Sequence, residues 1–195
     1  MTKKRGMVFV LIGTVLILSA LTLFLYNQYE NKQAGQVSEN LLDGVQKVIH
    51  EKKGTTSSQT EILDPKLPIT EIDGYGYVGY ISIPDLDLKL PVMSEWDYNR
   101  LKMAPCRQSG SSRTDDLVIV AHNYEKHFGH ISKLEVGDSV LFTDMDGIEN
   151  TYEVADVDTL KPTEVEKVQN SDYDLVLYTC TYDSKTRVTV FCNRL

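Results

Sequence analysis

The sequence predicts an all-β domain, built as a closed barrel or a sandwich with short helices, behind an N-terminal membrane helix. Two observations carry this prediction. Residues 7–26 hold no charged side chain and form a run long and apolar enough to cross a bilayer. From Gly74 onward, seven or eight short runs rich in aromatic and β-branched residues alternate with turn residues, a pattern typical of closed or layered β-structures.

The apolar run at the N-terminus is predicted to be an uncleaved anchor. Residues 1–6 contain the basic sequence KKR, and positive residues stay on the cytoplasmic side. We therefore expect a cytoplasmic tail over 1–6, a single pass through the cell membrane over 7–26, and an extracellular remainder. A cleaved signal peptide is the alternative, but its apolar region usually covers about 7–15 residues. The small residues Ser19-Ala20 also lie inside this longer run rather than after it.

Residues 27–72 are predicted to form a helical stalk and a linker before the all-β domain at 73–195. Apolar side chains recur at helical spacing at Val37, Leu41, Leu42, Val45, Val48 and Ile49. Such a stripe fits a helix that lies on the domain, pairs with a second copy or forms a stalk. Residues 54–60 (GTTSSQT) are small and polar, as in flexible linkers.

Within 73–195 the expected strands cover 75–83, 86–92, 117–121, 140–142, 151–157, 175–179 and 187–191, with a short helix over 95–103. Asp146-Gly147 predicts a hairpin turn. The run 117–121 (LVIVA) has no polar position, which indicates a strand buried on both faces.

The charge argues against a nucleic-acid partner. The formal net charge is −8, but residues 1–26 hold three of the 20 basic and none of the 28 acidic side chains. The remainder therefore has 17 basic and 28 acidic side chains, a net charge of −11. Because phosphate binding needs a basic face, we expect no nucleic-acid partner.

Cys180 is the candidate nucleophile. The chain has three cysteines, and an odd number in an exported protein indicates a reactive thiol or an intermolecular bond. Cys180 ends an apolar strand and Arg187 opens the next, so an antiparallel pairing would project both side chains from one rim. A cation beside a thiol favours the thiolate and can stabilise an oxyanion. A buried structural cysteine beside a surface arginine would give the same local pattern.

His122 is the candidate acid and base. It follows the buried run 117–121 at the start of a loop, and imidazole exchanges protons near neutral pH. A cysteine with a distant histidine is the pattern expected for thiol catalysis. His127 and His130 are the alternatives if the strand ends elsewhere. The spacing of these three histidines is not a usual zinc pattern, so we predict no metal.

The remaining candidates are weaker. An oxidising exterior permits a disulfide between Cys106 and Cys192. Cys192 is also a rival nucleophile, although no downstream strand supplies it with a partner. Arg113 is the rival of Arg187 for an oxyanion.

The segments around these residues resemble the sortase family. The matching pieces are Tyr80–Pro84 (YISIP), Ala121-His122-Asn123, Leu177–Cys180 (LYTC) and Arg187, and the resemblance covers about residues 74–195. It implies an eight-stranded barrel in which Cys180 attacks the Thr–Gly bond of an LPxTG-like sorting signal and forms a thioacyl-enzyme. His122 is implied to move the proton and Arg187 to hold substrate and oxyanion. Thr179 is implied to contact substrate or to shape the loop.

The resemblance also implies partners: surface proteins with a C-terminal sorting signal, and an acceptor amine of a cell-wall precursor or a pilin. The subclass, class B-like or pilin-type-like, stays open. Asp64-Pro65 resembles the lid motif of the pilin type, with Lys66 where an aromatic residue is expected. Some sortases are stimulated by Ca²⁺, but the acidic pairs of this chain lack EF-hand spacing, so no cofactor is predicted.

Two other functions fit the same residues. One is a non-enzymatic anchored β-domain that binds cell-wall or surface proteins, with a structural Cys180. The other is a thiol hydrolase.

Overall fold

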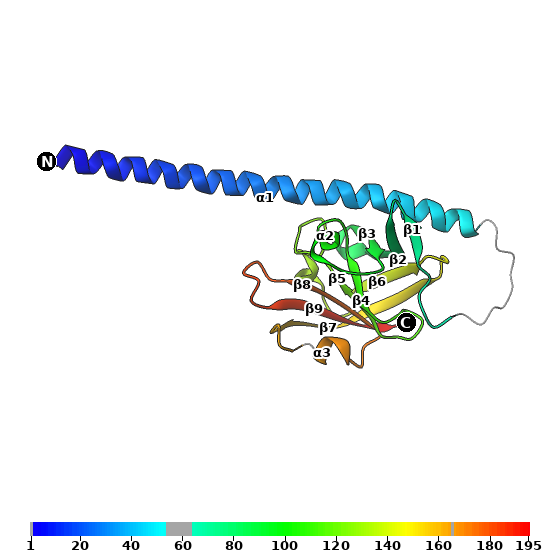
Figure 1. The fold of residues 1–195 in the computed structure, drawn as a ribbon. Helices are drawn as coiled ribbons and strands as arrows, with labels where there is room; N and C mark the ends of the chain where they lie inside the picture. Colours follow the sequence, from blue (N-terminus) through cyan, green and yellow to red (C-terminus); the bar gives the residue numbers. More distant parts are fainter. Residues whose placement is uncertain (1, 54–63, 165) are drawn as a thin grey trace. The chain divides into compact units, whose positions relative to one another are not determined.

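The computed structural model describes residues 2–53, 64–164 and 166–195 (Figure 1). The predicted linker at 54–60 lies outside the described residues. The chain divides into two compact units, the first ending at Gln33 and the second running from Ala34 to Leu195. The barrel and the candidate site belong to the second unit.

One long helix, α1 (Thr2–Lys53), contains both the apolar run and the predicted helical stripe. Its N-terminal part is long and apolar enough to cross a membrane, and apolar side chains such as Phe9 and Leu16 are exposed there. Its later part belongs to the second unit, where Val45 and Ile49 are fully buried and join a core cluster of the barrel. The stripe at 37–49 therefore lies on the domain.

The domain is a closed barrel of eight strands, β2 to β9, as predicted (Figure 1). Hydrogen bonding follows the order β2-β3-β4-β5-β8-β9-β7-β6, and pairing of β6 with β2 closes the barrel. A further strand, β1, pairs with β2. The strands are β1 (Thr70–Ile72), β2 (Tyr75–Ile83), β3 (Leu88–Met93), β4 (Cys106–Ser109), β5 (Leu117–Val120), β6 (Ser139–Asp144), β7 (Glu149–Leu160), β8 (Leu175–Cys180) and β9 (Arg187–Arg194).

In the described part of the chain, four short helices connect the strands: η1 (Pro84–Leu86), α2 (Tyr98–Leu101), η2 (Ile131–Lys133) and α3 (Glu166–Gln169). The predicted helix over 95–103 is confined to α2. The carboxylate of Asp97 accepts hydrogen bonds from the backbone N–H groups of Asn99 and Arg100 and so fixes where this helix begins. The predicted hairpin turn at Asp146-Gly147 joins β6 to β7, and Gly147 N donates to Asp144 O over 2.9 Å.

β5 is covered on both faces, which explains its uninterrupted apolar sequence. Ile119 points into the main core cluster of the barrel, whereas Val118 joins a second cluster with Val176 and Phe191. All four residues of the strand are buried. Its parallel partner β8 shares this environment, since Leu177 belongs to the main cluster and Val176 to the second.

A buried ion pair ties the loop after β4 to the end of β6. The guanidinium of Arg113 donates to the carboxylate of Asp144 over 2.7 Å, and the side chain of Asp144 is fully buried. The other carboxylate oxygen of Asp144 accepts from the N–H groups of Asp146 and Ile148. Asp146 also contacts Arg113 at 2.7 Å.

We expect Asp144→Ala to lower the free energy of unfolding by about 2–4 kcal/mol, because it removes the buried partner of the Arg113 guanidinium, which keeps only Asp146, and leaves the N–H groups of Asp146 and Ile148 without their acceptor. Urea denaturation of the full chain in detergent micelles measures this. Glu153→Ala, at an exposed position of β7, is the control and should stay within about 0.5 kcal/mol of the parent. Equal losses in the two variants would contradict a stabilising role of the pair.

Candidate functional site

Strand pairing brings the three predicted residues to one rim of the barrel. β5 and β8 run parallel with Val120 opposite Tyr178, and Ala121 N donates to Tyr178 O over 3.2 Å. Continued for two residues, this register puts His122 beside Cys180. β8 and β9 are antiparallel with Cys180 opposite Arg187, and directly opposed residues share a face of the sheet.

Thr179 locks the two parallel strands together at this rim. Its side chain is buried, and its hydroxyl donates to the carbonyl of Ala121 over 2.9 Å. Ala121 is the residue before His122. This contact favours the loop-shaping role of the two considered for Thr179.

The three thiols differ sharply in their surroundings. Cys180 is partly exposed at the strand end, whereas Cys106 and Cys192 are fully buried. Burial raises the pKa of Cys106 to about 12 and that of Cys192 to about 12, so neither gives a thiolate near neutral pH. Cys192 is therefore a poor rival nucleophile.

The candidate disulfide between Cys106 and Cys192 is not formed, since both thiols are free. The reason lies in the sheet order. Cys106 is on β4 and Cys192 on β9, and the strands β5 and β8 lie between them.

Arg187 is held by the turn that precedes it. Its Nη1 donates to the carbonyls of Ser184 and Thr186 over 3.2 and 2.9 Å. The turn is closed by Thr181, whose N–H and hydroxyl both donate to the carbonyl of Thr186. Among the described residues no carboxylate forms an ion pair with Arg187, so its charge stays available to the rim.

Around His122, the loop supplies contacts to both the edge and the face of the ring. Nδ1 lies 3.1 Å from Oδ1 of Asn123 and 3.2 Å from the N–H of the same residue. The ring of Tyr124 stacks on the imidazole with centroids 4.2 Å apart and planes 8° apart. Sequence reasoning did not assign a role to either neighbour.

The alternative histidines have different surroundings. His127 is only 1% exposed, and among the described residues no group meets hydrogen-bond geometry at either ring nitrogen. Burial lowers its pKa to about 4, which outweighs the opposing effect of the nearby backbone of Ala34. His130 is partly exposed and precedes η2. In the described part of the chain no three His, Cys, Asp or Glu side chains cluster as metal ligands.

Arg113 is a poor candidate for stabilising an oxyanion, because its guanidinium forms ion pairs with both Asp144 and Asp146. Asp115 instead pairs with Arg194. The acidic pairs thus meet arginines, and sequence alone did not reveal these partners.

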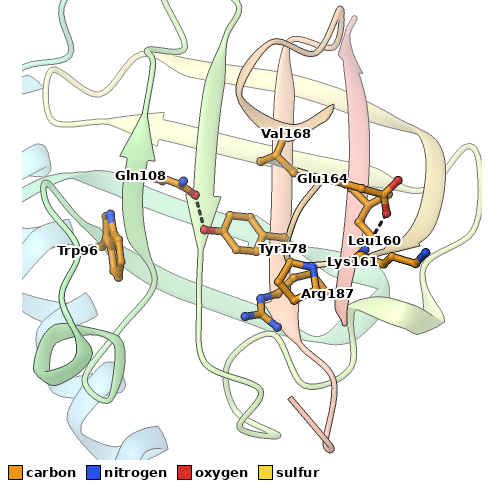
Figure 2. Close-up of a pocket in the computed structure, with 9 residues that line it drawn as sticks. Trp96, Gln108, Leu160, Lys161, Glu164, Val168, Tyr178 and Arg187 are labelled. Atoms are coloured by element: carbon orange, nitrogen blue, oxygen red, sulfur yellow. Dashed lines mark hydrogen bonds between the residues drawn. The ribbon is translucent and has the colours of Figure 1, made fainter. Parts of the chain in front are cut away.

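A pocket of about 230 Å³ lies next to Arg187 (Figure 2). This volume exceeds the roughly 150 Å³ of a cavity that holds a benzene ring, so one or two side chains of a peptide fit. Trp96 stands on one side and Leu160 on the other, and Tyr178 donates a hydrogen bond to Gln108 between them. The lining residues are Trp96, Gln108, Leu160, Lys161, Pro162, Glu164, Val168, Tyr178 and Arg187.

Apart from Arg187, the sequence did not identify these pocket residues. They come from the loop after β3, from β4, from the end of β7 and the segment that follows it, and from β8. No spacing along the chain links these segments. The only local signal was the aromatic Tyr178, two residues before Cys180.

Comparison with known proteins assigns this arrangement to a family. A family model described as the sortase domain matches residues 81–195. Because this is more than half of the chain, the protein belongs to the sortase family. A comparison with curated protein sequences finds no match.

Solved structures agree with this assignment. Sortase C-3 from Streptococcus pneumoniae is 25% identical, with a TM-score of 0.56 over 85% of this chain and 90% of that one. Sortase C1 from Streptococcus suis is 26% identical, with a TM-score of 0.54 over 61% and 73%. The sortase D5 transpeptidase from Clostridium perfringens shares the fold at 20% identity, with a TM-score of 0.61 over 82% and 99%.

We expect iodoacetamide to label Cys180 alone in the folded protein, because the other two thiols are buried and their pKa values are raised to about 12. Peptide mass spectrometry identifies the labelled cysteine. In urea without reductant, all three thiols should react. Labelling of only one thiol in urea would mean that Cys106 and Cys192 form a disulfide after all.

The lowered pKa of His127 predicts a loss of stability in acid. Between about pH 6.5 and 4 the unfolded chain takes up a proton that the folded protein excludes. The free energy of unfolding should therefore decrease as the pH is lowered from about 6.5 to 4, by up to roughly 1 kcal/mol per pH unit. Urea denaturation at several pH values tests this, and His127→Phe should flatten the slope. An unchanged slope in that variant would assign the effect to other groups.

Proposed function

We propose that this protein is a cysteine transpeptidase that cleaves an LPxTG-like sorting signal and transfers the surface protein to an amine. The observation that carries the proposal is the pairing of β8 with both β5 and β9, which aligns Cys180 with His122 and Arg187 at one rim. Membership of the sortase family supports it.

In the first half-reaction the Sγ thiolate of Cys180 attacks the carbonyl carbon of the scissile Thr–Gly bond. The guanidinium of Arg187, which no carboxylate among the described residues neutralises, stabilises the oxyanion. The carbon–nitrogen bond then breaks, and the imidazolium of His122 protonates the departing amine. The product is a thioacyl-enzyme.

In the second half-reaction an acceptor amine attacks the thioester carbonyl. His122 takes the proton of this amine, the carbon–sulfur bond breaks, and the thiolate of Cys180 is regenerated. The acceptor is an amine of a cell-wall precursor or a pilin lysine. The relatives include a sortase C from Streptococcus pneumoniae that is described in terms of pilin substrate specificity, which supports the second source.

The pocket beside Arg187 suits the apolar part of a sorting signal. Leu160 and Val168 lie on the side of the pocket away from Trp96 (Figure 2), and Pro162 is a further apolar lining residue. Bound there, the leucine and proline of the signal would present the scissile bond to Cys180. The binding energy of these side chains would orient the carbonyl for attack.

The apolar part of α1 is the proposed anchor of the enzyme. Residues 1–6 would then lie in the cytoplasm, 7–26 in the cell membrane, and the barrel outside the cell. Such an anchor keeps the enzyme at the surface where exported proteins emerge.

The central test uses the full chain in detergent micelles with a quenched fluorescent LPxTG-type peptide. Cys180→Ala should abolish cleavage, and His122→Ala and Arg187→Ala should each lower kcat/KM by at least about 100-fold. Circular dichroism should show all three folded. Cleavage by Cys180→Ala at the parent rate would refute the nucleophile.

The same assay separates the three functions. Added oligoglycine or a lysine peptide should yield an amide-linked product, detected by mass spectrometry, if the enzyme is a transpeptidase. Hydrolysis without transfer to any amine would identify a thiol hydrolase. Absence of cleavage for several related motifs, together with an unreactive Cys180, would favour a binding domain.

A further inference from the structure

The barrel fixes the thiol and the guanidinium but leaves the imidazole on a loop. Cys180 and Arg187 are strand residues paired to each other, whereas His122 lies two residues beyond the end of β5. Efficient proton transfer requires the ring to keep its orientation. Contacts within the loop must therefore hold the imidazole ring of His122 in place.

Asn123 can form a hydrogen bond with Nδ1 of His122 in both protonation states of the ring. In the neutral ring with the proton on Nε2, Nδ1 accepts from the N–H of Asn123, 3.2 Å away. In the imidazolium, Nδ1 carries a proton and donates to Oδ1 of Asn123, 3.1 Å away. These contacts tolerate the proton cycle, but they grip only one edge of the ring.

Tyr124 holds the face of the same ring. Its phenol ring lies parallel to the imidazole within 8°, with centroids 4.2 Å apart. A stack of this kind prevents the imidazole from rotating out of its plane, and an aromatic face also attracts the charged imidazolium. The stack thus favours the ring position in which Nε2 exchanges the proton.

Tyr124 is itself fixed by the turn that follows it. Its carbonyl accepts from the N–H groups of His127 and Gly129, both over 2.9 Å. The turn is so tight that a Cβ on Gly129 would come within 2.7 Å of the carbonyl oxygens of Asn123 and Tyr124. Phe128 N donates to His122 O over 3.2 Å and closes the loop onto the imidazole residue.

His127 also contacts the ring of Tyr124. The two rings meet edge to face, with centroids 5.5 Å apart and planes at 61°. His127 is buried near the buried Ala34 of α1, and a Cβ on Gly35 would come 3.0 Å from Lys126. The docked part of α1 therefore packs directly on this loop.

We propose that Tyr124 is a positioning residue for the imidazole of His122 and that His127, under α1, acts through Tyr124. This inference rests on the proposed acid–base role of His122. It makes the helix between Ala34 and Lys53 part of the apparatus that orients the imidazole.

The kinetic test uses the full chain in micelles with the fluorescent peptide. Tyr124→Leu should lower kcat roughly tenfold with KM within about twofold, because proton transfer suffers while peptide binding does not. Tyr124→Phe keeps the ring and should stay within about twofold of the parent. Tyr29→Leu, which removes an exposed ring from the first unit of the chain, is the control and should leave kcat unchanged.

A double variant tests the relay. His127→Leu alone should lower kcat, but Tyr124→Leu/His127→Leu should be no slower than Tyr124→Leu, because His127 acts through the ring already removed. If the two substitutions lowered kcat independently, so that their effects multiplied in the double variant, His127 would not act through Tyr124.

A spectroscopic measurement keeps the inference testable even if Tyr124→Leu fails to fold. In the parent protein labelled at histidine Cε1, the ring current of Tyr124 should shift the Hε1 signal of His122 upfield of that of the exposed His50. His122→Ala assigns the signal. Tyr124→Phe should keep the shift and Tyr124→Leu should lose it.

The outcomes separate this inference from the proposed function. If His122→Ala is inactive but Tyr124→Leu has the parent kcat, or if the parent shows no upfield shift, the positioning role is wrong and the proposed function stands. If His122→Ala keeps full activity, the acid–base assignment fails first.

Discussion

The parallel pairing of β5 with β8 is the constraint on which the site depends. Neighbouring side chains of both strands belong to different apolar clusters, with Ile119 and Leu177 in one and Val118 and Val176 in another. A slip by one residue would exchange the faces and misplace every one of these side chains. The core therefore fixes the register, and the register in turn sets His122 beside Cys180. β9 adds Arg187 through a short turn that only an antiparallel neighbour of β8 permits.

The consequence is a site with two kinds of support. Cys180 and Arg187 lie on paired strands, so backbone hydrogen bonds fix the positions of the thiol and the guanidinium. The imidazole depends on side-chain contacts in a loop, and that loop is covered in part by α1. The buried Val45 and Ile49 tie this helix to the same core cluster as Tyr77 and Met93. The part of this helix from Ala34 onward thus belongs to the folding unit of the barrel.

Much of this arrangement follows from local patterns, and the failures have physical causes. Strands with a buried face were predicted from their apolar runs, and the candidate residues stood out because each begins or follows such a run. β4 (CRQS) was missed because only Cys106 of the strand is buried, and the three-residue β1 is too short to show a period. The apolar stripe at 37–49 indicated that one face of a helix is buried, but it did not indicate which part of the protein covers that face. Trp96, Gln108 and Tyr178 meet only through tertiary pairing, which no spacing encodes.

The electrostatics of the rim depend on what each arginine contacts. In the described part of the chain Arg113 and Arg194 meet carboxylates, so their charge is neutralised within the fold. Arg187 donates to the carbonyls of Ser184 and Thr186 instead, because Asp183 in the same turn is engaged by Thr181 and by the N–H of Lys185. The turn between β8 and β9 thus keeps a positive charge for the strand end where a thiolate and an oxyanion would form.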